Sequence, residues 1–181
     1  MGMRRCGDCQ LCCRLLPVVP LKKLANETCQ FQKFHKGCTV HDTARMPIEC
    51  QLWNCRWILG DDTADLSRPD RSHYVIDISP DFISVDIPDQ GTLRIEVIQV
   101  WVDPAHRDAH RDPALRAYLQ RRAEESIAGL IRFSATDAIV LFAPPFDVDN
   151  GGQWFECDSA KREETHSFAE IVNALGIPLS G

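Results

Sequence analysis

The stretch CGDCQLCC at residues 6–13 opens a segment that contains eight of the nine cysteines of this 181-residue chain. The eight are Cys6, Cys9, Cys12, Cys13, Cys29, Cys38, Cys50 and Cys55. A buried cysteine that only fills space can be replaced by valine or alanine, so packing does not explain such dense and regular spacing. We therefore expect the segment that ends at Cys55 to bind metal through these thiolates.

Composition favours a cytoplasmic protein. No run of about 18 apolar residues could cross a bilayer, and Met1 is followed by no long apolar stretch typical of a secretory signal. In a reducing cytosol, clustered cysteines are metal ligands or redox groups more often than disulfides. Cys157, outside the segment, is expected to be a small buried residue.

The net charge of −6 hides an asymmetry along the chain. Residues 1–58 contain nine Lys and Arg against four Asp and Glu, whereas the remainder contains 11 against 22. A basic patch for nucleic acid is one explanation. The other is that these cations offset the negative charge of metal-bound thiolates. We prefer the second explanation and do not expect nucleic acid as a partner.

The chain divides into three parts. Residues 1–58 form the cysteine segment, 59–71 read as a linker, and 72–181 have the pattern of an α+β domain. Within the third part, apolar runs at 74–78, 82–87 and 92–102 predict an antiparallel meander. The apolar phase of the third run shifts between Val97 and Ile98, which predicts a bulge or burial of both faces. A further strand is expected at 138–142.

Two helices are expected. Asp112 can cap a helix that has Pro113 in its first turn. The apolar stripe assigned to this helix comprises Leu115, Leu119, Ala123, Ile127, Leu130 and Ile131. The second helix follows the capping box of Ser167 and Glu170. The predicted fold class is thus α+β: a loop-rich, metal-stapled cysteine cluster packed as one unit on a small antiparallel sheet with two helices.

Two cysteines separated by two residues can reach one metal around a tight turn, and thiolates select zinc, copper(I) or iron–sulfur clusters. Eight thiolates could form two four-cysteine centres, one polynuclear cluster, or one centre with four spare thiols. The spacing leaves these alternatives open.

The order of the motifs resembles the bacterial YkgJ-type cysteine-cluster family, whose members are described as zinc- or iron-chelating domains. The resemblance covers about residues 6–58 and rests on C-x-x-C-x-x-C-C, the later single cysteines, R-x-P-x-x-C at 45–50 and W-x-C-x-W at 53–57. It departs from the family pattern at Val40-His41 and at Met46. The resemblance implies metal binding and no defined reaction.

Zinc is favoured over iron because the C-P that follows the third cysteine in bacterial ferredoxins is missing here. The main hypothesis is a zinc- or iron-binding protein that acts in metal binding or delivery, or as a metal-stabilised module for a protein partner. One alternative is an iron–sulfur protein that assists or performs a redox or modification reaction. Another is a zinc-ribbon-like nucleic-acid binder. No catalytic motif is found, so whether the protein is an enzyme stays open, with a leaning against it.

Histidines are secondary candidates as ligands. His35 and His41 lie within the cysteine segment, where either could replace a thiolate. His106 and His110 are four residues apart, which would place both imidazoles on one face of a helix. The Arg- and Asp-rich sequence around them is more typical of a solvated turn.

Overall fold

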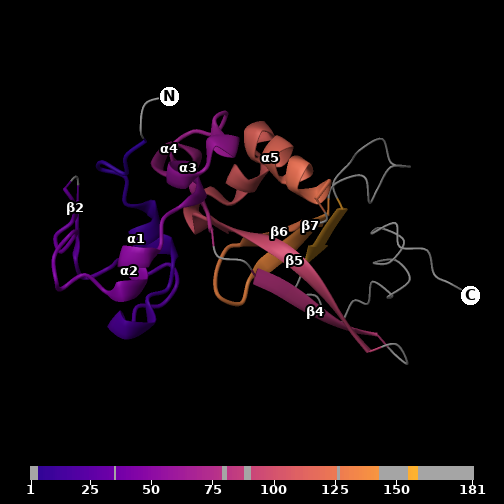
Figure 1. Ribbon diagram of the computed structural model, residues 1–181, viewed down its shortest axis with the longest axis horizontal. Helices are drawn as coiled ribbons and strands as arrows, with labels where there is room; N and C mark the ends of the chain where they lie inside the picture. Colours follow the sequence, from indigo (N-terminus) through magenta and orange to yellow (C-terminus); the bar gives the residue numbers. More distant parts are fainter. Residues whose placement is uncertain are drawn as a thin grey trace, which may run out of the picture.

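The computed structural model describes residues 4–34, 36–78, 81–87, 91–125, 127–142 and 155–158. These residues form short helices, a two-stranded sheet and a six-stranded sheet, in agreement with the predicted α+β class (Figure 1). The helices are α1 (Leu11–Leu15), α2 (Ile48–Leu52), α3 (Arg56–Leu59), α4 (Pro69–Ser72), α5 (Pro113–Ala123) and the 3-10 helices η1 (Val19–Leu21), η2 (Asp61–Thr63) and η3 (Pro104–Arg111). The strands are β1 (Gln32–Lys33), β2 (Gly37–Cys38), β3 (Tyr74–Ile76), β4 (Asp81–Ile87), β5 (Gly91–Val102), β6 (Ala128–Arg132), β7 (Ala138–Phe142) and β8 (Phe155–Asp158). The helix predicted after Ser167 lies outside the described residues.

Strands β3, β4 and β5 form one long hairpin, so the predicted meander is wrong. Both β3 and β4 pair antiparallel with β5, along the edge opposite to β6. Four residues lie between Ile76 and Asp81, but only two lie between their partners Val100 and Val97. The chain that runs from β3 into β4 therefore has two more residues than the facing part of β5. These extra residues lie opposite the part of β5 where its apolar phase shifts, between Val97 and Ile98. The bulge that the sequence predicted in β5 is therefore found in the facing chain, between β3 and β4.

The predicted first helix begins as expected but ends early. The side chain of Asp112 accepts a hydrogen bond from the Ala114 N–H, and α5 runs to Ala123. Residues 128–132, whose apolar positions were assigned to the helix, instead form β6, which pairs parallel with β5. A parallel pair needs a crossover connection, and α5 supplies it. The sheet is therefore mixed rather than antiparallel.

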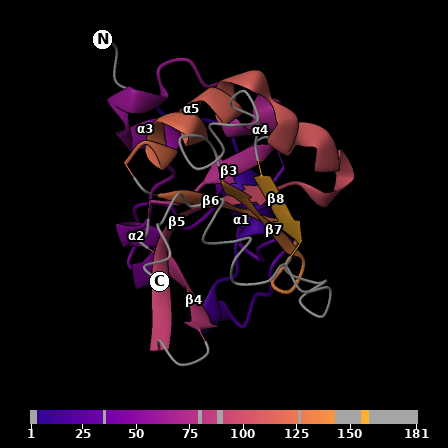
Figure 2. The ribbon, with the colours of Figure 1, turned by 90° about the vertical axis from the view of Figure 1, so that its right-hand side faces the viewer.

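The two faces of the sheet are covered by different layers. Tyr74, Ile76, Val100 and Val102 pack with α5 in the larger core. The residues between them, Val75 and Trp101, pack with α1 and cysteines of the N-terminal segment. Because neighbouring strand residues point to opposite faces, α5 and the cysteine segment lie on opposite sides of this part of the sheet (Figures 1 and 2). Burial of both faces explains why apolar residues occupy both faces of β5 between Val97 and Val102.

Residues 59–71 contribute to the interior. Thr63 is fully buried, and Leu66 belongs to the core beneath α5. The Arg4 guanidinium donates to the Thr63 hydroxyl at 2.9 Å and to the Trp57 carbonyl at 2.7 Å. Among the described residues, no helix has both the length and the apolar character needed to cross a lipid bilayer.

Candidate metal centre

The eight cysteines of the N-terminal segment lie on short elements joined by loops. Cys6 and Cys9 lie in the turn before α1, Cys12 and Cys13 on α1, Cys29 before β1, Cys38 on β2, Cys50 on α2 and Cys55 directly before α3. All eight are free thiols. The segment is thus held by packing and hydrogen bonds, with no disulfide among these cysteines.

Two left-handed glycines bring the first motif beside the β1–β2 hairpin. Gly7, at φ 58°, turns the chain so that the Cys9 N–H donates to the Cys6 carbonyl at 3.0 Å. Gly37, at φ 82°, turns the hairpin, and a Cβ at this position would lie 3.6 Å from the Gly7 carbonyl oxygen. A side chain at either glycine would strain the backbone. The turn containing Cys6 and Cys9 therefore lies close to Cys38.

Four thiols form an inner group against the sheet: Cys6, Cys9, Cys12 and Cys55. The thiol of Cys6 interacts electrostatically with those of Cys9 and Cys55, and that of Cys12 with those of Cys6 and Cys55. Both also interact with Cys13, the next residue on α1. The group packs against Val75 and Trp101, with Trp53 and Trp57 at its side. Its surroundings are therefore apolar and aromatic.

The other four thiols form an outer group: Cys13, Cys29, Cys38 and Cys50. The Cys50 thiol interacts electrostatically with those of the other three, and burial raises its pKa. The side chain of Lys23 interacts electrostatically with Cys29 and Cys13 of this group, and also with Glu27 and with Cys12 of the inner group. Cys13 follows Cys12 directly on α1, so the two groups are joined by one peptide bond.

Paired thiols shift each other's pKa values. A hydrogen bond from Cys6 lowers the pKa of Cys9 to about 7, and the same bond together with burial raises the pKa of Cys6. Cys12 acts in the same way on Cys13, whose pKa falls to about 7, and the charge of Lys23 contributes to that fall. Each pair therefore has one thiol that is partly thiolate at neutral pH, which is the form that binds metal.

Three of the positively charged side chains of residues 1–58 bind groups other than the thiols. Arg14 forms an ion pair with Asp103, and Arg56 pairs with Asp62 at 3.0 Å. Arg4 binds the carbonyl groups near η2. Lys23 does face the thiols. Lys23 is therefore one cation whose charge offsets that of the thiolates, and it lowers the pKa of Cys13.

The thiols are gathered but do not stand at metal-bonding separation. A tetrahedral zinc site with Zn–S bonds of about 2.3 Å places its sulfurs roughly 3.8 Å apart. Within the described part of the chain, no three of these sulfur atoms lie within 4.8 Å of one another. Their donor chemistry fits zinc or iron, because eight buried or half-buried free thiols of this kind are soft ligands. A metal would have to draw each group together.

The histidine candidates have separate surroundings. His35 lies outside the described residues. His41 is exposed, with Nδ1 2.9 Å from the Asp42 carboxylate, and acts electrostatically on Cys13. His110 is buried, its Nδ1 lies 2.6 Å from the Arg107 carbonyl oxygen, and its ring meets Phe133 edge-on.

The structure does not bring His106 and His110 together on one helical face. Residues 104–111 form a 3-10 segment with a kink at His106, whose φ and ψ are −132° and 53°. The His106 ring instead stacks on His73, with ring centroids 3.6 Å apart.

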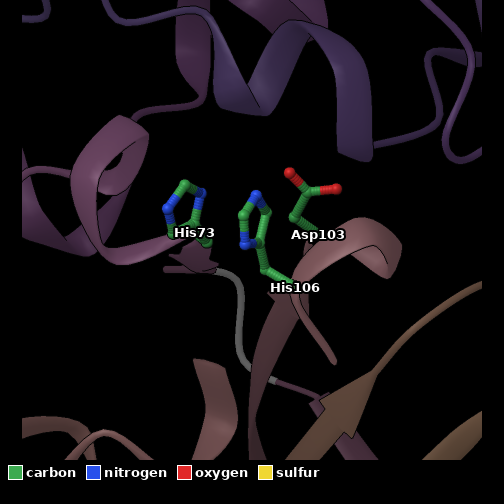
Figure 3. Close-up of side chains that lie close together, drawn as sticks. All are labelled: His73, Asp103 and His106. Atoms are coloured by element: carbon green, nitrogen blue, oxygen red, sulfur yellow. The ribbon is translucent and has the colours of Figure 1, made fainter. Parts of the chain in front are cut away.

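A second group of potential ligands, which sequence reasoning missed, lies at the end of the hairpin. One ligand atom from each of His73, Asp103 and His106 falls within 4.8 Å of the other two (Figure 3). Among the described residues, this is the one set of three or more His, Cys, Asp or Glu that meets this distance. His73 is distant in sequence from the other two, and only the register of β3 on β5 places it next to Asp103.

Comparison of the chain with protein-family models, with curated proteins and with solved structures finds no match.

Proposed function

We propose that this protein binds zinc or iron through the eight cysteines of residues 6–55. The observation that supports the proposal is the gathering of eight free thiols around α1, four of them against the sheet and four around Cys50, with Cys13 interacting with both sets. Four thiolates complete one tetrahedral site, so each group has the ligand number of one closed centre. The role that follows is metal binding or delivery, or the stabilisation of a surface for a protein partner.

The inner group would hold the more sheltered centre. Cys6, Cys9, Cys12 and Cys55 lie against the sheet with tryptophan side chains around them. A closed zinc site here would stabilise a segment whose own apolar core is small. The aromatic surroundings also suit an iron–sulfur cluster, whose potential depends on exclusion of solvent. Such a cluster would supply electron transfer, and this is the second candidate function.

The first test is the metal content of the full chain purified without oxygen. Elemental analysis should give about two zinc ions per chain if both groups are closed zinc centres. Broad visible absorption together with stoichiometric iron would indicate the iron–sulfur alternative. A native protein without stoichiometric metal, whose cysteines all react freely with an alkylating reagent, would contradict the proposal.

Serine variants test the division into two groups. Cys55→Ser removes an inner ligand, and Cys29→Ser removes an outer one. Each should lower the metal content by about half if the centres are separate, because each centre needs four ligands. A single polynuclear cluster would instead lose nearly all its metal in both variants. Cys157→Ser, outside the segment, is the matched control and should retain the full content.

A further inference from the structure

We propose that His73, Asp103 and His106 form a separate site for one divalent transition-metal ion. Two imidazoles and one carboxylate are a donor set that zinc and iron(II) accept in proteins. The site uses nitrogen and oxygen ligands at the end of the long hairpin, and it shares no residue with either thiol group. This proposal can therefore be tested separately from metal binding by the cysteines.

The backbone holds the three residues together. The Asp103 N–H donates to the His73 carbonyl at 2.9 Å, which continues the pairing of Tyr74 with Val102 by one position. The His106 N–H donates to the Asp103 carbonyl at 2.8 Å. Each ligand residue is thus hydrogen-bonded through its main chain to the next. Such anchoring reduces the conformational freedom that metal binding would otherwise have to remove.

The carboxylate is already fixed in position. Asp103 is 3% exposed, and its Oδ1 accepts a hydrogen bond from the Ala105 N–H at 3.1 Å. Its Oδ2 is bound by Arg14 of α1. A carboxylate has about four lone-pair directions, so these two partners leave room for a metal ion. Partners of this kind commonly orient a carboxylate ligand and balance its charge.

The two rings can adjust to an ion. They stack with an angle of 15° between their planes, and the His106 ring lies between the His73 ring and the Asp103 carboxylate in the view of Figure 3. An ion lying in the plane of both imidazoles requires the rings to splay apart. The exposed side chain of His106 can make that movement, whereas His73 is half-buried.

The site opens on a cavity of about 500 Å³ that His73 and His106 help to line. Ser67, Arg71 and Arg107 are among its other walls. Three protein ligands leave coordination positions unfilled, and those facing the cavity can take water or a small oxygen ligand. This openness distinguishes the site from a four-thiolate centre, whose ligands close the coordination sphere. An ion here would act as a Lewis acid toward whatever occupies the cavity.

The test is a cobalt(II) titration of the full chain that has been loaded with no more zinc than its thiol groups hold, so that the tighter thiolate sites take the zinc and the site of His73, Asp103 and His106 stays open. The unaltered chain should bind about one further cobalt ion in a nitrogen and oxygen environment, without the charge-transfer absorption of cobalt–thiolate bonds. His106→Gln should abolish that binding, and because the side chain is exposed, its fold should be retained. His73→Asn should do the same, since asparagine tolerates the φ of 62° found at this position.

Asp108→Asn is the matched control, because its carboxylate lies in the same segment, is 96% exposed and is no part of the ligand set. It should bind cobalt as the unaltered chain does. Equal cobalt binding by His106→Gln and the unaltered chain would overturn the proposal, as would additional cobalt with sulfur ligands only. The zinc held by the thiol groups should be the same in all these variants, so failure here leaves the cysteine proposal unaffected.

Discussion

Lys23 is a buried cation that holds the cysteine segment together. Its ammonium donates to the carbonyls of Arg14 and Leu24 at 3.2 Å each, and also to that of Leu16. Burial lowers the pKa of Lys23, and the neighbouring thiols oppose that shift. We predict that Lys23→Met, which keeps the length of the side chain but no donor, lowers the free energy of unfolding by about 2 kcal/mol. Urea denaturation at constant metal content measures this loss.

Lys22→Met is the control for that prediction. Lys22 precedes Lys23 and is exposed, so its removal changes the net charge by the same amount without leaving carbonyl groups unpaired. The control should alter the free energy of unfolding by less than about 0.5 kcal/mol. Equal losses in the two variants would show that charge, rather than the three hydrogen bonds, is what matters.

At the scale of elements, the close contact between α5 and β6 requires a glycine, Gly129, on the strand. A Cβ at Gly129 would lie 3.1 Å from Leu119 Cδ1, closer than most such contacts. We predict that Gly129→Val forces α5 away from the sheet and costs about 1–3 kcal/mol of stability. Leu119→Ala removes the opposing atoms, so the double variant should be less destabilised than the sum of the two single changes. Thermal and urea unfolding of the four proteins give this comparison, and strict additivity would contradict the predicted clash.

The sequence predicted the start of α5 correctly but not its end. The Asp112–Pro113 start of α5, the strand at 138–142 and the positions of β4 and β5 followed from local pattern and were confirmed. Leu130 and Ile131 stand at helical spacing from the preceding apolar residues, so periodicity alone favoured a longer helix. Their place in β6 is decided by parallel pairing with β5, a contact between distant segments that local pattern does not contain.

The candidate sites divide in a similar way. The spacing of the cysteines identified the eight thiols, but their division into two groups depends on how α1, α2 and α3 pack, which the sequence left open. The His106–His110 hypothesis assumed a regular helix, and the kink at His106 removes that assumption. His73 carried no local signal, because its closeness to His106 arises only from strand register.

On the scale of the whole molecule, the cysteine segment is fastened to the sheet at several points. Arg14 binds Asp103 at the end of β5, and the Asn26 amide donates to the Phe133 carbonyl at 2.7 Å beyond β6. Between these polar contacts, Leu15 of α1 and Val75 of β3 are both fully buried in the same apolar cluster, where the cysteine segment packs on the sheet. A segment held this way has no separate core that could survive without the sheet. The two parts should therefore unfold together.

This coupling predicts a single unfolding transition that shifts with metal. A metal that binds only the folded chain stabilises it by about 2.7 kcal/mol when present at 100 times its dissociation constant. Because the inner thiols lie on Val75 and Trp101, that stabilisation should reach the whole sheet. Urea unfolding followed by tryptophan fluorescence and by circular dichroism should give coincident curves, and a chelator should move both to lower urea. Two separate unfolding transitions, of which the chelator shifts only one, would contradict this prediction. The cysteine segment would then be an independent unit, and metal bound to it would not stabilise the α+β core.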